Sequence, residues 1–180
     1  MISIRDATLA DMAAILPIYN DAVTNTTAVF DYAPRGLEAQ QAWFAAKQEQ
    51  KLPVLLAVEQ DAVLGFASFG PFRPWPAYRH TVENSIYVDA SARGRGAGRK
   101  LLHALIEACT ARGFRQMVAV IGDSANAGSI ALHRACGFAG IGILPATGFK
   151  FGRWIDTVLM QRALGPGDTT LPEDGDAFSG

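Results

Sequence analysis

The feature that most constrains the fold is VDASARGRGAGRKLL at residues 88–102, where small and basic residues stand between two apolar runs. The run before it, TVENSIYV, is typical of a strand, and the run after it repeats apolar residues at helical spacing until Gly113. A turn from a strand into a helix directs free backbone N–H groups and the helix dipole at one point. The stretch therefore predicts an anion site, and a pyrophosphate is the natural ligand.

Two common nucleotide-binding motifs are disfavoured at this turn. A P-loop needs Lys followed by Ser or Thr after its last glycine, whereas Gly98 is followed by Arg99 and Lys100. A Rossmann site opens its domain and has an acidic residue at the end of the next strand, whereas this turn is central and the next strand ends VAVIG. Taken alone, the turn could still be a glycine-rich connection with a solvated run of charges.

The rest of the chain predicts strands and helices of one α/β (α+β) domain. Strands are expected at ISIRDAT, LPVLLAVE, AVLGFASFG, RQMVAVIG, and at about 138–146 and 154–162, with a hairpin turn near Gln60 and Asp61. Helices are expected at DMAAILPIYNDAV with Asp11 as its cap, at residues 37–50, and in SANAGSIALHRACGF as far as Gly137. FRPWPAYRH contains two prolines, so it is expected to be a loop that exposes its side chains.

Composition limits the classes of protein to which the chain can belong. We expect one domain over residues 1–164 and a disordered acidic tail over 165–180. The 16 Lys and Arg nearly balance the 17 Asp and Glu, which disfavours a nucleic-acid binder. No apolar run approaches the ~18 residues of a membrane span, and the start lacks a secretory signal, so we expect a cytoplasmic protein. Cys109 and Cys136 are expected to be buried reduced thiols, and no metal site is expected.

Two motifs in order identify a family resemblance. VDASARGRGAGRKLL resembles the acyl-CoA pyrophosphate loop of the GNAT N-acyltransferase superfamily, and NAGSIALHRACGF resembles its second motif, an Asn followed by a helix that ends in Gly-Phe. TVENSIYVD, VAVIG, LHRACGF and GFKFGRWIDTVLMQ are similar to the branch of phosphinothricin and methionine sulfoximine acetyltransferases. The resemblance implies the GNAT fold, a mixed and mostly antiparallel twisted sheet of about seven strands with about four helices.

The resemblance also implies that acetyl-CoA is the cofactor. Backbone amides of the glycine-rich turn would bind its phosphates, and the preceding strand would line its pantetheine arm. A splayed end of that strand could leave an N–H free for the thioester carbonyl. Asn126 would contact the cofactor and could also cap its helix. The expected cofactor residues are Ile86, Tyr87, Val88, Arg93, Gly94, Arg95, Gly96, Ala97, Gly98, Arg99, Asn126 and Ser129.

Glu83 and His133 are the expected catalytic residues. Glu83 matches the proposed general base of the resembling branch, and partial burial would raise its pKa toward neutrality. The alternative for Glu83 is an edge residue or an ion pair with Arg79. His133 shares a helix face with Asn126 and Ile130, and it stands where many GNAT enzymes have Tyr. It could protonate the leaving thiolate or receive the amine proton, or it could be structural.

The expected substrate is a small amino acid or analogue that is acetylated on its α-amine. The resembling enzymes act on acids with anionic groups, which suit Arg73 and Arg79, while Asp31 stands where the branch has Glu. The expected substrate residues are Phe30, Asp31, Arg73, Arg79, Phe149 and Lys150, and the last two could close the pocket either from the same subunit or from the partner of a homodimer. A peptide N-terminal acetyltransferase and a non-catalytic acyl-CoA sensor are the alternatives.

Overall fold

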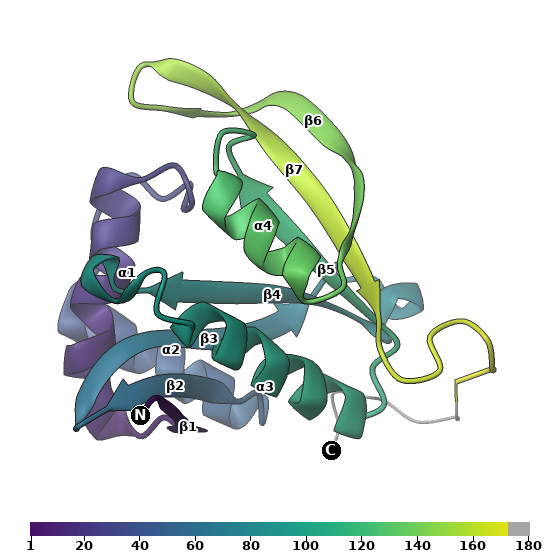
Figure 1. The fold of residues 1–180 in the computed structure, drawn as a ribbon, viewed down its shortest axis with the longest axis horizontal. Coiled ribbons are helices and arrows are strands. Elements are labelled where there is room, and N and C mark those ends of the chain that lie inside the picture. The colour runs from purple at the N-terminus through teal and green to yellow at the C-terminus, as the bar shows by residue number, and fades with distance from the viewer. Residues whose placement is uncertain (173–180) are drawn as a thin grey trace.

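The chain forms one mixed seven-stranded sheet in the order β1-β2-β3-β4-β5-β7-β6 (Figure 1). The structure is a computed structural model, and it describes residues 1–172. The strands are β1 (Ser3–Asp6), β2 (Val54–Glu59), β3 (Ala62–Pro71), β4 (Thr81–Val88), β5 (Gln116–Gly122), β6 (Ala139–Lys150) and β7 (Arg153–Ala163). The α-helices of this part are α1 (Met12–Asn25), α2 (Leu37–Glu49), α3 (Ala97–Ala111) and α4 (Ala127–Ala135). The expected α/β fold, with about seven strands and four helices, is confirmed.

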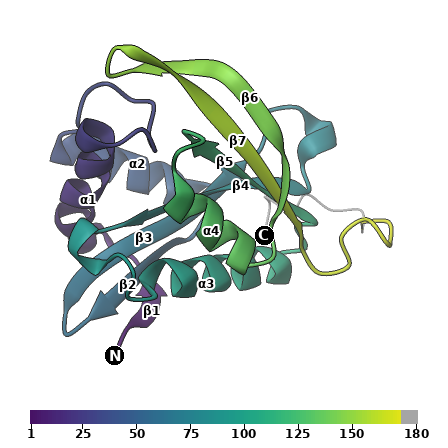
Figure 2. The same cartoon turned by 45° about the horizontal axis from the view of Figure 1, so that its top comes forward.

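Strands β2 and β3 are buried on both faces, and alternate residues enter two separate cores. Leu55 and Ala57 belong to the core under α3, whereas Val54 and Leu56 belong to the core under α1 and α2. This division follows from the two-residue period of a strand. Figure 2 shows α3 on one side of these strands, with α1 and α2 on the other.

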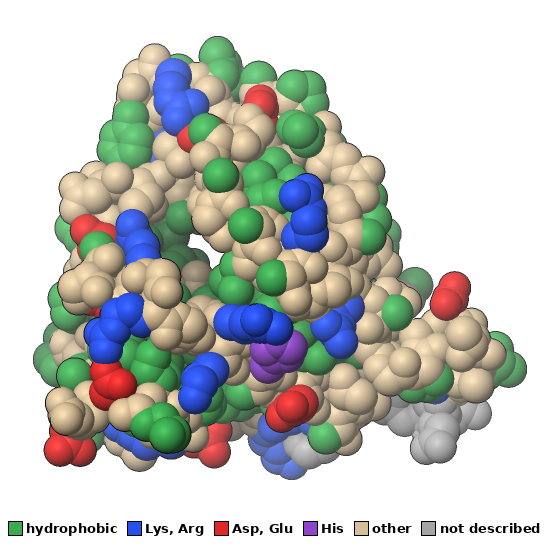
Figure 3. All heavy atoms as spheres, in the orientation of Figure 1, with side chains coloured by type: hydrophobic (Ala, Val, Ile, Leu, Met, Phe, Trp, Pro, Cys, Tyr) green, Lys and Arg blue, Asp and Glu red, His purple; other side chains and the backbone are tan. Residues whose placement is uncertain are grey.

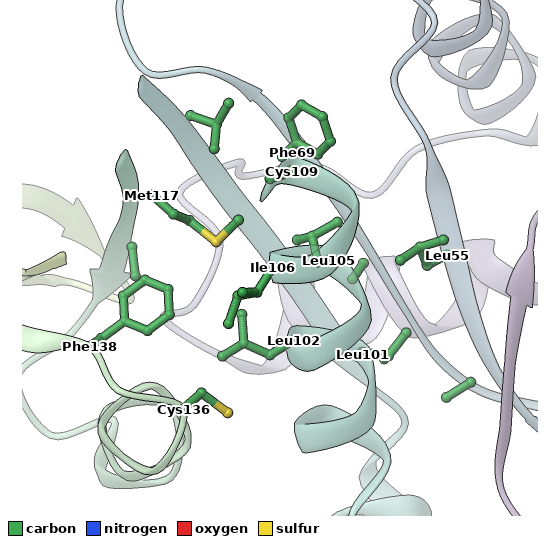
Figure 4. Close-up of a cluster of buried hydrophobic side chains, with 14 of the residues drawn as sticks. Leu55, Phe69, Leu101, Leu102, Leu105, Ile106, Cys109, Met117, Cys136 and Phe138 are labelled. Carbon is green, nitrogen blue, oxygen red and sulfur yellow. The ribbon is translucent and has the colours of Figure 1, made fainter. Parts of the chain in front are cut away.

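Helix α3 holds the glycine-rich turn in place through its packing. Leu101, Leu102 and Leu105 are fully buried, and they lie between the sheet and the end of α4, where Cys136 and Phe138 complete the cluster (Figure 4). Complete burial of each leucine contributes about 1.5–3 kcal/mol. The start of α3 is therefore fixed relative to β4. The prediction that Cys109 and Cys136 are buried free thiols is confirmed.

The sheet divides between β4 and β5. These parallel strands pair only at Thr81–Gln116, Val82–Met117 and Glu83–Val118, although β4 continues to Val88. On its other edge β4 pairs with β3 as far as Val88, and β5 pairs with β7 along its whole length. Figure 1 shows the two strands diverging from their shared end. The edge of β4 beyond Glu83 consequently faces a gap instead of a neighbouring strand.

Three local predictions need correction. Asp11 directly precedes α1, but its side chain does not cap this helix. Its carboxylate accepts hydrogen bonds from Arg5 and from the Thr8 N–H, at the short 3-10 helix Leu9–Asp11. The proline-rich loop includes a 3-10 turn at Pro76–Tyr78, because Pro fits the first position of such a turn. Strands β6 and β7 extend beyond the expected ranges, since their pairing with each other reaches the turn at Phe151 and Gly152.

The first residues of the expected tail make hydrogen bonds to the folded domain. The Arg115 guanidinium donates to the carbonyl oxygens of Gly167 and Leu171 and to Thr170 Oγ1 at 2.9–3.1 Å. These bonds attach residues 165–171 to the start of β5. Residues 173–180, which carry three of the four acidic residues of the tail, lie outside the described part of the chain.

Candidate active site

The glycine-rich turn has a backbone that directs main-chain groups into a cavity. Gly94 has φ +75° and Gly96 has φ +89°, values that residues with a Cβ atom rarely adopt. Gly96 is the N-cap of α3, so the first N–H groups of this helix have no partner within it. Gly98 is close-packed, because a Cβ there would lie 3.3 Å from Leu132 and 3.4 Å from Val88. The turn is thus a main-chain anion site with a helix N-terminus behind it.

Three of the four basic side chains of the turn are bound to other groups, and the fourth, Arg99, lines the cavity. Arg93 lies 3.7 Å from Asp21 of α1, and Arg95 forms an ion pair with Glu59 of β2. Lys100 donates to the carbonyl oxygen of Ile2 at 2.7 Å. These contacts brace the turn against neighbouring elements. Backbone amides, more than free cations, therefore form the anion site.

A large cavity of about 930 Å³ begins at this turn and runs between α1 and α4. Figure 3 shows the corresponding hollow, with Lys and Arg side chains around it. The cavity brings together eleven of the twelve expected cofactor residues, and only Arg95 lies outside its lining. The eleven are Ile86, Tyr87, Val88, Arg93, Gly94, Gly96, Ala97, Gly98, Arg99, Asn126 and Ser129.

A smaller cavity of about 280 Å³ continues the first one into the fork between β4 and β5. Glu83, Asn84 and Ser85 line it from β4, while Phe30 and Asp31 line it from the loop after α1. Six residues line both cavities, namely Ala28, Ile86, Tyr87, Asn126, Ser129 and His133. A long ligand in the larger cavity can therefore reach a small ligand in the smaller one.

Glu83 lies where β4 loses its partner strand. Its side chain is 35% exposed, and its nearest cation is Arg73, with Nη1 at 3.9 Å from Oε2. Glu83 therefore forms its ion pair with Arg73, and not with Arg79 as the alternative reading expected. Burial raises the pKa of Glu83 above its ordinary value, and Arg73 opposes this shift only in part. The result is a partly desolvated carboxylate at the wall of the smaller cavity.

His133 lies at the junction of the two cavities and is nearly buried. Its Nδ1 is 2.8 Å from the carbonyl oxygen of Ser129, and its Nε2 is 3.1 Å from Asn84 Oδ1. Burial lowers the pKa of His133, which favours the neutral ring at pH 7. Asn126 caps α4 by accepting from Ser129 N–H, as predicted, whereas Ile130 packs into the core under α3.

The loop after α1 forms the far wall of the smaller cavity. The Phe30 ring lies against Gly122 and Gly148, where a Cβ atom would come within 2.8 Å of it. Asp31 accepts a short hydrogen bond from Tyr19 and lies 3.6 Å from Arg35. Its carboxylate is therefore partly neutralised before any substrate ammonium arrives. Sequence reasoning missed Tyr19 and Arg35, which belong to no recognised motif.

Four of the expected substrate residues do not line either cavity: Arg73, Arg79, Phe149 and Lys150. Lys150 is 3% exposed, and its ammonium group donates to the carbonyl oxygens of Val23, Thr26 and Val29. Since all three donors are used within the chain, we correct its assignment from substrate contact to anchor of the loop after α1. Phe149 is half exposed beside Trp154.

Asp123 is a third residue that sequence reasoning missed. It has φ +76°, it is buried, and it binds Ala125 N–H, Arg153 and Thr27. The Ala125 N–H, aided by Arg153, holds the pKa of Asp123 below its ordinary value. Its contacts join the end of β5, the start of β7 and the loop after α1 around the larger cavity. Its place directly after VAVIG and three residues before Asn126 is the signal that could have identified it.

Comparisons with known proteins agree with this geometry. Residues 14–138 match the model of the acetyltransferase (GNAT) family. An L-methionine sulfoximine/L-methionine sulfone acetyltransferase of Pseudomonas paraeruginosa is 51% identical over 165 residues, which cover 91% of this chain and 95% of the relative. A phosphinothricin N-acetyltransferase of Alcaligenes faecalis is 47% identical over 163 residues, covering 91% and 83% of the two chains.

A solved structure extends the likeness to three dimensions. The crystal structure of a GNAT superfamily phosphinothricin acetyltransferase from Sinorhizobium meliloti, in complex with AcCoA, superimposes with a TM-score of 0.93 at 44% identity. The match covers 97% of this chain and 95% of the other. The family model, the similar sequences and the solved structure all indicate the same family, in agreement with the divided sheet and the glycine-rich turn. The chain belongs to the GNAT acetyltransferase family.

Proposed function

We propose that the protein transfers an acetyl group from acetyl-CoA to the α-amine of a small amino acid or analogue, such as methionine sulfoximine, methionine sulfone or phosphinothricin. The observation that carries this proposal is the pair of adjoining cavities. One has a main-chain anion site at its outer end, and the other has a partly desolvated carboxylate at its wall. The activities for which the close relatives are named support the same substrate class.

The cofactor end is suited to coenzyme A. The amides of residues 93–98 and the N-terminus of α3 would hold the pyrophosphate, and Ile86, Tyr87 and Val88 would line the pantetheine arm. The fit depends on glycine, since the backbone at Gly94 and Gly96 turns back at positive φ to present its amides. When bound, acetyl-CoA supplies an acyl thioester as the electrophile.

The acceptor end is suited to remove a proton from an amine. We assign Glu83 as the general base, acting directly or through one water, because burial raises its pKa and so favours proton uptake. As the amine nitrogen bonds to the acetyl carbon, its proton passes to Glu83 and the thiolate leaves. The unpaired edge of β4 beyond Glu83 offers N–H groups for the oxygen of the tetrahedral intermediate.

His133 receives a different role from the one expected of it. A buried neutral ring with both nitrogens engaged is a poor general acid, so we assign it to positioning at the junction of the cavities. Arg73, 3.9 Å from Glu83, can still meet an anionic group of the substrate at the mouth of the smaller cavity. Arg79 keeps this role only as a prediction.

The test is release of free thiol from acetyl-CoA with a panel of acceptors. The panel contains methionine sulfoximine, methionine sulfone, phosphinothricin, free amino acids and a short peptide. Release with the small acids alone supports the proposal. Release with the peptide alone selects a peptide N-terminal acetyltransferase, and CoA binding without release selects a non-catalytic acyl-CoA sensor.

We also propose that the protein is a cytoplasmic homodimer. Residues 139–147 of the edge strand β6 are all exposed, and they include Ile141, Ile143 and Leu144; Trp154 of β7 is 65% exposed. An exposed apolar edge strand of this length is a self-association surface in a stable protein. The two free buried thiols suit a reducing compartment. Analytical ultracentrifugation of wild type and Ile143→Glu should show a dimer that the substitution dissociates.

A further inference from the structure

The charged side chains in the lining of the smaller cavity are both acidic. Glu83 lines it from β4 and Asp31 from the loop after α1, and within residues 1–172 no Lys or Arg belongs to this lining. The cations beside the two acids lie outside it: Arg73 is 3.9 Å from Glu83 Oε2, and Arg35 is 3.6 Å from Asp31 Oδ2. The Lys150 ammonium, also near Asp31, is bonded to three carbonyl oxygens. A small ligand in this cavity therefore meets carboxylates before it meets a cation.

Glu83 and Asp31 belong to the same side of the sheet. Side chains of β4 alternate between the two faces, so Glu83, Ser85 and Tyr87 share one face. Tyr87 packs against the core under α1 and α2, where its ring lies 5.4 Å from that of Tyr19. The Tyr19 hydroxyl in turn donates to Asp31. A continuous row of side chains therefore connects the two carboxylates along one wall.

The contacts of Asp31 occupy only one of its two oxygens. Oδ2 accepts the short hydrogen bond from Tyr19, and it is also the oxygen that lies 3.6 Å from Arg35. Arg35 donates to the Tyr19 hydroxyl oxygen at 2.7 Å, and its guanidinium carbon lies 3.9 Å from the centre of the Tyr19 ring. Arg35 can only donate, so the Tyr19 proton is directed to Asp31. Oδ1 has no partner among the described residues, and the side chain is 53% exposed.

The three acceptors named above have side chains of nearly the same shape but of different charge. Each ends in a tetrahedral sulfur or phosphorus with one methyl group and two small heteroatoms. The sulfone is neutral and has two acceptor oxygens, the sulfoximine is neutral and has one N–H donor, and the phosphinate is an anion. Arg73 at the mouth suits the α-carboxylate that all three share. The second anion of phosphinothricin then finds no cation in the lining of the cavity.

We propose that Asp31 selects the acceptor by the charge of its side chain, so that neutral sulfone and sulfoximine side chains are accepted and the anionic phosphinate is rejected. This inference rests on the proposed function and ranks the acceptors within it. Two like charges repel strongly in a partly desolvated site, whereas the free Oδ1 can accept the N–H of a sulfoximine. Arg35, beside Oδ2, is a positioning residue that moderates the charge of Asp31.

The test compares kcat/KM for methionine sulfone and for phosphinothricin, because this pair differs mainly in charge. The wild type should prefer the sulfone at least about tenfold, mostly through KM for the acceptor, and should use the sulfoximine at least as well as the sulfone. Asp31→Asn keeps the size of the side chain and an oxygen for Tyr19. It should lower the preference to about twofold or less and change KM for acetyl-CoA less than about twofold.

Arg35→Gln should change the preference in the opposite direction. Its amide can still donate to the Tyr19 hydroxyl, but it no longer compensates Asp31, so the preference for the sulfone should rise a further threefold or so, about 3-fold over wild type. A purely structural role for this cluster would not move the two variants in opposite directions. Asp21→Asn is the matched control, since Asp21 also lies beside an arginine, 3.7 Å from Arg93, but lines neither cavity. It should leave the preference between acceptors unchanged, whatever its effect on KM for acetyl-CoA.

The outcomes separate this inference from the function on which it rests. Wild-type protein that acetylates none of the small acids removes both. An active wild type that uses phosphinothricin as well as methionine sulfone overturns the inference alone, and so does a preference that Asp31→Asn leaves unchanged. If Asp31→Asn fails to fold or to bind CoA, Arg35→Gln decides, and a preference that does not rise there overturns the inference equally.

Discussion

Replacing Lys150 by Met should destabilise the protein and also weaken binding of the amine acceptor. The Lys150 ammonium is 2.5 Å from the carbonyl oxygen of Val23, 2.6 Å from that of Val29 and 3.0 Å from that of Thr26. Val23 is among the last four residues of α1, so its carbonyl has no partner within the helix. The buried cation also lies at the negative end of the helix dipole.

The magnitude follows from the three carbonyl groups. Each buried carbonyl that loses its donor costs about 1–3 kcal/mol, and removal of the ammonium recovers part of its own desolvation cost. We therefore expect a loss of about 3 kcal/mol, which corresponds to a Tm lower by about 6–12 °C for a chain of this size. Because the anchored loop contributes Ala28, Val29, Phe30 and Asp31 to the smaller cavity, KM for the acceptor should rise more than KM for acetyl-CoA.

Thermal and urea unfolding, followed by circular dichroism, measure the loss. The chain supplies a graded set of controls, since Lys47 donates to one carbonyl, that of Phe69, at 2.6 Å, and Lys51 is exposed. The expected order of destabilisation is Lys150→Met, then Lys47→Met, then Lys51→Met at about zero. If Lys150→Met is as stable as Lys51→Met, the three bonds do not anchor the loop and the reasoning fails.

Three further predictions test other parts of the molecule. Glu83→Gln should keep CoA affinity and lower kcat/KM by about 10²-fold. The activity of the wild type should fall on acidification with a midpoint above 4.5, the ordinary pKa of Glu, and this fall should be absent from the variant. Gly96→Ala places a Cβ at φ +89°, so calorimetry should show CoA binding weakened about tenfold, and unchanged binding would argue against the main-chain anion site. A hydrogen bond from Arg5 holds the pKa of Asp11 well below its usual range; this stability is present above pH 3.8 and is lost as pH falls through the folded-state value, so the stability difference between wild type and Asp11→Asn should shrink on acidification.

The sequence predicted those parts of the site that depend on neighbouring residues. The turn at 88–102, the cap at Asn126 and the helix ends at Gly113 and Gly137 follow from local backbone chemistry, and each is observed. Apolar patterns predicted the individual strands, because such a pattern is visible within six or eight residues, whereas the mixed sheet was implied by the family resemblance. The ends of β6 and β7 were missed, since pairing across their turn extends them beyond the apolar pattern.

The remaining parts depend on contacts between distant residues. Lys150 binds Val23 from 127 positions away, and Asn84 meets His133 across 49. A lysine after an aromatic residue gives no sign in the sequence that it will be buried, and we expected a substrate contact instead. Arg93 and Arg95 were assigned to the cofactor from their position in the motif, but their partners Asp21 and Glu59 come from elements that the motif does not include.

The short ladder between β4 and β5 also divides the sheet into two parts. Within residues 1–172, three residue pairs form the strand contact between β1–β4 and the block β5–β7–β6. Backbone hydrogen bonds between neighbouring strands are therefore fewest at this point, while the ladders on either side of it are longer. A ligand bound in the fork contacts both β4 and β5, so its binding would join the two halves and raise the stability of the folded protein.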